Sequence, residues 1–450
     1  MRKKRFRSCI WGLVKAQVKN QAQPKYTAKC PKFFRHGRGY LPKNRKPFWE
    51  KAYIRKPTRF MHSKKTFPPV NCTSSATTGA EVSWFAPLCN GDDAFLGERH
   101  TDYKSNWDNT SEIGRTADRL GFRNMLCPSS YQVGQDTLNF AAALAPQLQQ
   151  MNLLTAIRCG EVHPPMLARA LSTLDHILNG RLTVNIISSD LPGLKESSET
   201  RYARSKEVIE ILKQAWTQDQ IDYQGDFYQL QLDSRPVKPY QQNGGPLLYF
   251  GGYSPPGLEL CAQHCDVYLM WPETQDKIHG LMETMAQKAA AYGRTVDFGL
   301  RVHVIVRETE QEAKAYAEKL LSKLDLDKGT EIRNRAQDAK SMGVARQTEM
   351  RNQAGEDFYV ESHLWTGIGL TRSGCGAALV GNPEQILAKI RAYQDIGIRS
   401  FIFSGYPHLQ EAAYFARLVL PHLETISLPE VHGRIPSSPP KTPLANGTRI

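Results

Sequence analysis

The sequence has no long run of apolar residues. No stretch approaches the roughly 18 consecutive apolar residues of a membrane-spanning helix. The apolar run after the charged N-terminus, from Cys9 to Val14, is too short for the core of a secretory signal. Cysteine is sparse and irregular, because the nine residues follow no repeating framework. This usage favours reduced thiols. We therefore expect a soluble, cytoplasmic protein that does not enter the membrane.

Clustered metal ligands are also scarce. The closest group is Cys261, His264 and Cys265, which lies in a predicted helix and lacks the fourth ligand that a structural zinc site needs. Buried free cysteine commonly serves as a small hydrophobic residue. No metal site is predicted.

Acidic residues are nearly absent from the first part of the chain. The whole chain carries a net charge of +14, but residues 1–70 hold 21 of its 58 Lys and Arg and only one of its 44 acidic residues, Glu50. The remaining 380 residues are therefore mildly acidic, at −6. The basicity belongs to an N-terminal extension, and the charge of the body gives no support for binding nucleic acid.

The extension, residues 1–78, is rich in Lys, Arg and Pro and has no sustained apolar periodicity, so we expect little structure in it. Three interpretations remain open for it: an arm that binds nucleic acid or a membrane surface, an acid-poor targeting segment, or translation upstream of a start near Met61. At the other end, residues 426–450 are predicted to form a flexible Pro-rich tail.

Short apolar runs alternate with helical patterns through residues 79–425, the predicted catalytic domain. The eight runs are Val82–Phe85, Phe122–Cys127, Leu153–Arg158, Leu182–Ile187, Leu247–Phe250, Val267–Trp271, Leu300–Val306 and Phe401–Phe403. The clearest helical patterns are Glu199–Gln214, Gln275–Tyr292, Glu310–Leu321 and Glu384–Asp395. Near-continuous apolar strands separated by amphipathic helices indicate a covered parallel sheet, and eight such units predict an α/β fold, the (β/α)₈ TIM barrel.

Two segments interrupt the repeat. Residues 219–235 alternate around a central turn, as a hairpin does. Residues 324–370, between the seventh and eighth strands, are long, charged and weakly apolar. A long insertion on this side of a barrel is typical of a mobile active-site lid.

The active site of a barrel lies at the carboxyl ends of its strands, so polar residues there are the candidates. They are Arg158 at the end of the third run, Asn185 in the fourth, Gly251, Gly252 and Ser254 after the fifth, Trp271 at the end of the sixth, Arg301 and His303 in the seventh, and Ser404 and Tyr406 after the eighth. Arg301 and His303 are two apart and face the same side of their strand. A buried arginine is costly unless an anion pairs with it, which favours a functional role.

The other candidates have structural alternatives. Trp271 could be a packing residue, and Asn185 and Ser404 could be satisfied polar groups of the core. Gly251 and Gly252, followed by Ser254 and a helix start, would allow backbone N–H groups and a hydroxyl to hold a phosphate.

Five longer strings carry a family resemblance. They are Leu247–Pro255, Asp266–Trp271, Phe298–Thr309, Trp365–Gly374 and Phe403–Leu409. In this order they resemble the alkanesulfonate monooxygenase branch of the bacterial luciferase-like flavin monooxygenases, and the match runs from Val82 to Leu423. The resemblance implies a two-component system in which a separate NAD(P)H-dependent reductase supplies FMNH₂. Reaction with O₂ through a flavin peroxide would then convert a small organosulfonate, or a related organosulfur compound, into an aldehyde and sulfite.

The resemblance also implies roles for individual residues. Arg301, His303, Tyr406 and Arg372 correspond to the catalytic set, Trp271 to a wall of the flavin pocket, and Asn185, Arg201, Tyr202 and Ser254 to FMN contacts. Arginine suits the anionic flavin and sulfonate. A histidine that titrates near neutrality could pass a proton, and Tyr406 could donate to a developing oxyanion.

One loop departs from the family pattern. Alkanesulfonate enzymes carry a Cys after the second strand, whereas Pro128–Leu138 has none here, and Cys89-Asn90 stand where a His is common after the first strand. These changes concern pocket-lining positions, so they affect the substrate more than the chemistry.

The sequence leaves several alternatives open. The nearest is another luciferase-like oxidoreductase: a long-chain alkane or aldehyde monooxygenase, or a deazaflavin-dependent dehydrogenase. From a different class, the protein could be a non-catalytic barrel that binds flavin or nucleic acid. By family analogy it is expected to be a homodimer or homotetramer.

Overall fold

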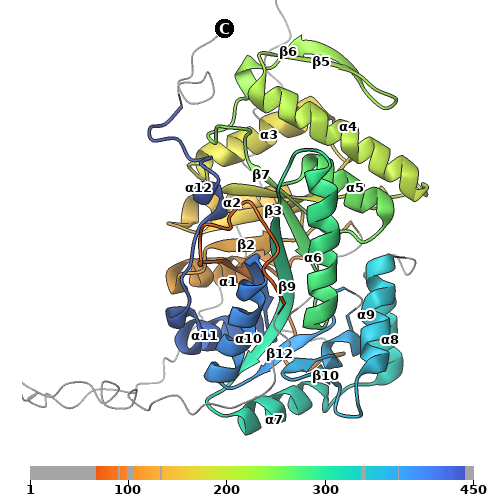
Figure 1. Ribbon diagram of the computed structural model, residues 1–450, viewed down its shortest axis with the longest axis vertical. Coiled ribbons are helices and arrows are strands. Elements are labelled where there is room, and N and C mark those ends of the chain that lie inside the picture. The colour runs from red at the N-terminus through yellow and green to blue at the C-terminus, as the bar shows by residue number, and fades with distance from the viewer. Residues whose placement is uncertain are drawn as a thin grey trace, which may run out of the picture. The chain divides into compact units, whose positions relative to one another are not determined.

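Eight parallel strands close into a barrel in the computed structural model (Figure 1). The strands are β1 (Glu81–Phe85), β2 (Asn124–Cys127), β3 (Asn152–Arg158), β4 (Leu182–Ile187), β7 (Leu247–Phe250), β8 (Val267–Met270), β9 (Asp297–Val306) and β13 (Ile398–Ser404). They pair in this order, and β9 closes the ring by pairing with both β8 and β13. The predicted TIM barrel is confirmed, and each of the eight apolar runs overlaps one of its strands.

The structure describes residues 67–440 apart from 90–91, 99–104, 132–133, 336–340 and 373. Most of the predicted basic extension, residues 1–66, and the end of the predicted tail, residues 441–450, lie outside this range. The interpretations of the extension given above therefore stay predictions.

Helices cover the outside of the barrel. They are α1 (Trp107–Leu120), α2 (Thr137–Leu144), α3 (Pro164–Ile177), α4 (Ser198–Thr217), α5 (Pro255–His264), α6 (Gln275–Ala290), α7 (Glu310–Leu321), α10 (Pro383–Asp395) and α11 (His408–Leu418). Short 3₁₀ turns occupy Ala145–Gln147, Arg235–Val237, Gly367–Leu370 and Leu420–His422. Helices α3 to α6 pack on one another in sequence order around the barrel (Figure 1).

Local sequence signals define where these helices begin. Asn382 caps α10, its side chain accepts from the backbone N–H of Gln385, and Pro383 follows at the first helical position. Thr309 and Glu312 form the same reciprocal capping box at the start of α7. Such boxes satisfy N–H groups that have no partner inside the helix, and they explain why both helices begin within one residue of their predicted starts.

The insertion after α7 contains both helix and sheet. It comprises α8 (Leu326–Arg335), α9 (Met342–Gln353), β10 (Tyr359–Glu361) and β11 (Leu364–Trp365), and β12 (Ala378–Gly381) follows it. Strand β12 pairs in parallel with the second half of β9, where Ala378 lies opposite His303, and β11 adds to β12 antiparallel. The sequence analysis did not predict this extension, because four-residue and two-residue strands leave little periodicity to detect.

The predicted hairpin is present as β5 (Gln220–Gln224) and β6 (Gln229–Asp233). Its turn is held by the carboxylate of Glu207 on α4, which accepts from the backbone N–H groups of Asp226, Phe227 and Tyr228 at 2.7–3.0 Å. The turn is thereby fixed to the outer helical layer.

A polar network fills the amino-terminal end of the barrel. The buried carboxyl of Glu81 accepts from the Tyr249 hydroxyl at 2.7 Å and from the amides of Asn124 and Asn152 at 3.2 and 3.3 Å. Burial raises the pKa of Glu81, and these hydrogen bonds lower it only in part. This end is packed and closed, so any site inside the barrel must open at the carboxyl ends of the strands.

Both predicted domain boundaries need correction. Residues 67–78 are not low in structure: Val70 and Cys72 are buried, and Ser74 donates from its backbone N and its Oγ to Asp297 at 2.8 and 2.7 Å. The predicted flexible tail from residue 426 begins with a short helix, α12 (Leu428–Val431), in which Leu428 is fully buried against the barrel interior. Neither segment has a long apolar pattern, and their burial depends on partners distant in the sequence.

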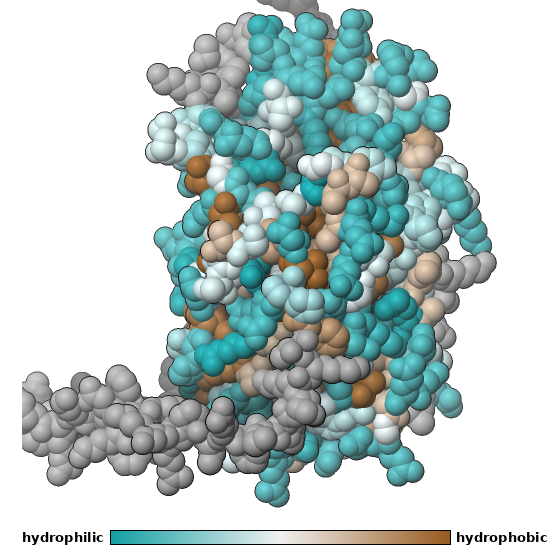
Figure 2. Space-filling model, in the orientation of Figure 1, coloured by the Kyte–Doolittle hydropathy of each residue, from teal (hydrophilic) through white to brown (hydrophobic). Residues whose placement is uncertain are grey.

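The face of the molecule drawn in Figure 2 is mostly hydrophilic, with hydrophobic residues scattered across it. Among the residues that the structure describes, no helix combines the length and the hydropathy needed to cross a membrane.

Candidate active site

Arg301 and His303 meet at the hydroxyl of Ser404. The two residues lie on β9, and Ser404 ends the neighbouring strand β13 directly opposite His303. The Oγ of Ser404 accepts from Arg301 Nη1 at 2.8 Å and lies 2.7 Å from His303 Nδ1. The hydroxyl can donate to the imidazole while it accepts from the guanidinium. Ser404 therefore fixes the orientation of both side chains.

Arg301 is a buried cation without an acidic partner among the described residues. Its guanidinium carbon lies 4.3 Å from the centroid of the Phe85 ring, and its side-chain hydrogen bond goes to Ser404. Burial lowers its pKa, although guanidinium remains charged in proteins. A charge held in this way favours the arrival of an anion.

His303 is held uncharged. Burial, together with the positive charge of Arg301, lowers its pKa well below its ordinary value. Its ring stacks on Tyr406 with centroids 5.3 Å apart. This direction of shift is away from the near-neutral titration expected from the sequence, which could not show how completely the ring is buried beside a guanidinium.

Arg372 reaches Tyr406 from the far end of the insertion. Its Nε donates to the Tyr406 hydroxyl at 2.9 Å, and its Nη2 lies 2.5 Å from Oδ2 of Asp93. Burial raises the pKa of Tyr406, whereas the charge and hydrogen bond of Arg372 lower it. The four residues of the predicted catalytic set are thus brought together.

The sequence analysis assigned no role to three further residues at this site. Asp92 accepts from the backbone N of His408 at 3.0 Å and lies 2.7 Å from its Nδ1, while the neighbouring Asp93 binds Arg372. His408 is buried, its ring contacts Tyr406 edge-on, and its Nε2 has no partner among the described residues. The adjacent pair Asp92-Asp93 soon after the first strand was the available signal.

A second group of predicted residues gathers where β7 meets α5. Ser254 caps α5 by accepting from the backbone N of Gly257, and its Oγ donates to the Tyr202 hydroxyl at 3.1 Å. The carbonyl of Gly252 accepts from the Tyr268 hydroxyl at 2.9 Å. Gly251 is exposed, and a Cβ there would approach the Leu269 carbonyl to 3.3 Å. A helix start with a hydroxyl pair and exposed glycine backbone is suited to a phosphate.

Two predicted arginines, Arg158 at the end of β3 and Arg201 in α4, are already paired with the loop after β4. Arg158 Nη1 donates to the Asp190 carbonyl at 2.9 Å and also to the Ser189 hydroxyl, and Arg201 Nη1 lies 2.7 Å from Asp190 Oδ1. Their Nε atoms are buried without a hydrogen-bond partner among the described residues, although Arg158 Nε lies 3.7 Å from Oε1 of Glu161. Donors therefore remain on this side of the barrel.

Asn185 and Trp271 occupy the two remaining positions. Asn185 on β4 has a buried Oδ1 without a hydrogen-bond partner in the described part of the chain, so it is not the satisfied core amide that the alternative required. The backbone N of Trp271 donates to the Tyr253 hydroxyl at 2.6 Å. A Cβ on Gly343 of α9 would lie 2.7 Å from the Trp271 ring, so the insertion packs directly on this residue.

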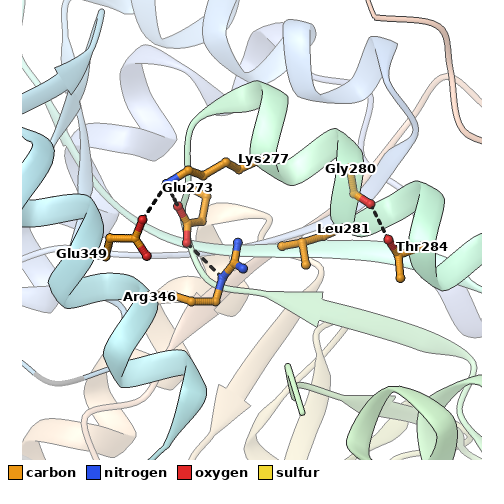
Figure 3. A pocket seen from close by; sticks show the side chains of 7 residues that line it. All are labelled: Glu273, Lys277, Gly280, Leu281, Thr284, Arg346 and Glu349. Atoms are coloured by element: carbon orange, nitrogen blue, oxygen red, sulfur yellow. Dashed lines mark hydrogen bonds and ion pairs between the residues drawn. The ribbon is translucent and has the colours of Figure 1, made fainter. Parts of the chain in front are cut away.

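A charged hollow lies between α6 and α9 of the insertion (Figure 3). Arg346 of α9 and Lys277 of α6 converge on the buried Glu273, with N–O distances of 3.2 and 3.7 Å, and Lys277 also reaches Glu349. Burial raises the pKa of Glu273. These acids and bases neutralise one another, so we assign the hollow to anchoring α9 rather than to catalysis.

The residues present fit a flavin phosphate. The Tyr202–Ser254 pair and the glycine backbone at the start of α5 lie at the carboxyl ends of the strands, together with the guanidinium groups of Arg158 and Arg201. Among the described residues, no group of three or more His, Cys, Asp or Glu could hold a metal ion.

A closed (β/α)₈ barrel with cationic and phenolic groups at the carboxyl ends of its strands has the layout of a TIM-barrel enzyme. The luciferase-like monooxygenase family model matches residues 81–400. The chain belongs to this family of flavin-dependent monooxygenases, as its motifs predicted.

Three known proteins show the range of similarity. The chain is 57% identical over 381 residues to a sulfoquinovose monooxygenase of Agrobacterium fabrum. The matched region covers 84% of this chain and 99% of that protein. It is 51% identical over 355 residues to a sulfoquinovose monooxygenase of Novosphingobium aromaticivorans, covering 77% and 98%. A riboflavin lyase structure with modified FMN and riboflavin has a TM-score of 0.62 at 15% identity, covering 82% of this chain and 96% of that one. The last similarity supports the fold alone.

Proposed function

We propose that the protein is an FMNH₂- and O₂-dependent monooxygenase that cleaves the C–S bond of sulfoquinovose or a closely related sugar sulfonate, releasing sulfite and an aldehyde. The observation that carries the proposal is Arg301, a buried cation with no acidic partner among the described residues. A sulfonate remains ionised at all physiological pH values and can pair with such a charge. The two relatives above are named for this reaction class, and their similarity supports the sugar as substrate.

The proposed substrate accounts for the departure in the Pro128–Leu138 loop. The sequence predicted a small organosulfonate, whereas the relatives favour a sulfonated sugar. A sugar carries several hydroxyl groups that an alkanesulfonate lacks, so a changed wall beside an unchanged Arg301 is consistent with a different body on the same anionic group.

The flavin would be held at the second group of residues. Tyr202, Ser254 and the backbone of Gly251 and Gly252 would bind its phosphate, with Arg158 and Arg201 adding positive charge. Asn185 and Trp271 would line the ring pocket. When bound, the reduced flavin supplies the electrons that activate O₂.

The protein residues then have distinct roles. Arg301 binds and orients the sulfonate, and Ser404 holds Arg301 in place. His303 accepts from the Ser404 hydroxyl at Nδ1, so in the uncharged ring Nε2 carries the proton and can donate a hydrogen bond to the substrate or to water. Tyr406, with its hydroxyl bound by Arg372, donates a hydrogen bond where negative charge develops. The insertion excludes water while these groups act.

Further parts of the proposal follow from the two-component scheme. FMNH₂ comes from a separate NAD(P)H-dependent reductase, the enzyme acts in the cytoplasm, and the chain forms a homo-oligomer.

An alkane or aldehyde substrate is disfavoured, because it would leave Arg301 without a counter-ion.

An anaerobic mixture of enzyme and FMNH₂, pulsed with O₂ in the presence of sulfoquinovose, tests the proposal. Stoichiometric sulfite is expected from wild type and none from Arg301→Met. Octanesulfonate and hexadecane serve as competing substrates. Oxidised hexadecane without sulfite from either sulfonate would contradict the proposal.

A further inference from the structure

Asp93 joins two segments that are far apart in the sequence and meet at the active site. It belongs to the loop after β1, and Arg372 lies at the end of the insertion, 279 positions further along the chain. Their carboxylate and guanidinium approach to 2.5 Å, with side chains only 10% and 11% exposed. The same guanidinium donates to the Tyr406 hydroxyl. One chain of contacts therefore runs from Asp93 through Arg372 to Tyr406.

The two arginines of the site differ in how their charge is balanced. Arg301 has no acidic partner among the described residues, whereas the charge of Arg372 is neutralised by Asp93. Asp93 is buried as well, beside Asp92, and both effects raise the pKa of its carboxyl while Arg372 lowers it. A neutralised guanidinium has little remaining attraction for a second anion, so Arg372 is poorly suited to bind the sulfonate by charge.

The described residues on either side of Asp93 make contacts with the rest of the barrel. Asp92 holds the backbone N and the ring of His408, and Leu96 donates its backbone N to the Leu320 carbonyl at 2.8 Å. Leu96 packs with Trp365 and Tyr406 in one apolar cluster. Contacts at Asp92 and Leu96 thus hold the chain on both sides of Asp93, as is needed for a residue that positions another.

We propose that Asp93 is a positioning residue that clamps Arg372 onto Tyr406 and so fastens the end of the insertion over the active site. The proposal deepens the proposed function, on which its kinetic test rests. Asp93 contacts neither substrate nor flavin in this scheme. Arg372 serves the reaction by orienting the Tyr406 hydroxyl, and Arg301 alone supplies the charge for the sulfonate.

A double-mutant cycle on kcat/KM for sulfoquinovose tests the clamp. Asp93→Asn keeps the shape but removes the charge, and we expect a loss of about 10²-fold, in line with a misplaced catalytic group. The loss should lie in kcat, with KM changed by less than about threefold, because Arg301 still binds the sulfonate. The Asp93→Asn/Arg372→Gln double variant should be no worse than Arg372→Gln alone, since residues that act as a unit are not additive. Asp93→Glu should recover part of the loss.

Limited trypsin digestion of the enzyme without substrate supplies a second measurement that does not depend on the proposed function. We expect Asp93→Asn and Arg372→Gln each to speed cleavage within residues 324–370 at least fivefold. The matched control is Glu308→Gln, which breaks the exposed pair with Arg417, of which both side chains are 58% exposed, and should leave cleavage unchanged.

The outcomes separate the two proposals. If wild type releases no sulfite from any sulfonate, the proposed function fails, and the digestion still tests the clamp. If the losses of Asp93→Asn and Arg372→Gln multiply, if the change falls in KM, or if cleavage of the insertion is unchanged in both variants, the clamp is wrong. Should Asp93→Asn not fold, Arg372→Gln alone decides the digestion.

Discussion

The Oγ of Ser404 lies 2.7 Å from Nδ1 of His303, across the pairing of β13 and β9. The same hydroxyl accepts from Arg301, so one serine binds an uncharged imidazole and a charged guanidinium that would otherwise stand unsupported. This arrangement explains how a cation and a histidine can share one buried site without an acid between them. It also keeps the histidine neutral, which has a measurable consequence for stability.

We predict that His303 makes the fold less stable in acid. Its folded pKa lies well below the ordinary value of 6.5. The unfolded chain therefore takes up a proton at this histidine as the pH falls through 6.5, while the folded protein does not, so stability is lost below that pH. The loss is up to ~1.4 kcal/mol per pH unit for one such group.

Urea unfolding between pH 6.5 and 5 measures this effect. The free energy of unfolding should fall less steeply with pH in His303→Gln than in wild type. His163→Gln, at an exposed histidine, is the control, and an unchanged slope in His303→Gln would contradict the prediction.

The balance of charge around Arg301 predicts a trade between stability and activity. Arg301→Met removes a buried cation that has no acidic partner, so the free energy of unfolding should stay the same or rise by about 1–2 kcal/mol. Activity should fall by ~10³-fold or more through loss of the sulfonate contact. Thermal unfolding and sulfite release measure the two effects.

Arg307→Met is the matched comparison. Arg307 pairs with the buried Glu411 at 2.6 Å and lies between the rings of Tyr316 and Tyr414. Removing it leaves a buried carboxylate unpaired, which typically costs ~3–5 kcal/mol. A similar destabilisation in both variants would mean that Arg301 has an anionic partner in the folded protein.

Two glycines provide a test of how α9 packs on the flavin side of the site. An alanine Cβ at Gly343 would lie 2.7 Å from the Trp271 ring, whereas at Gly280 of α6 nothing lies within 4 Å. Gly343→Ala should displace α9, lower kcat and shift the tryptophan fluorescence. Gly280→Ala should leave activity unchanged and raise the free energy of unfolding by ~1 kcal/mol, as expected for a helix interior. Equal behaviour of the two variants would show that α9 does not rest on Trp271.

The sequence predicted the barrel and much of the site because both depend on local patterns. Each barrel strand is a short apolar run, and parallel strands bring their carboxyl ends to one side, so Arg301, His303, Ser404 and Tyr406 had to lie at the same end of the barrel. The partners of these residues were not predictable in the same way. Asp93 and Arg372 are joined only by tertiary structure, and the neutrality of His303 depends on burial that no spacing reveals.

The chain ends show the same limit, and they carry the last prediction. Residues 426–450 read as a Pro-rich tail, yet Leu428 is fully buried in the apolar cluster that contains Leu154, Tyr249 and Leu269 inside the barrel. Directly after α12, His432 Nε2 lies 2.7 Å from Asp297, the carboxylate that also binds Ser74. Leu428→Ala should therefore lower the free energy of unfolding by ~2–5 kcal/mol, the usual cost of such a cavity. Val431→Ala, at an exposed position of the same helix, should change it by less than ~0.5 kcal/mol. Urea unfolding measures both, and an equally small effect of the two variants would mean that this segment is the flexible tail the composition indicated.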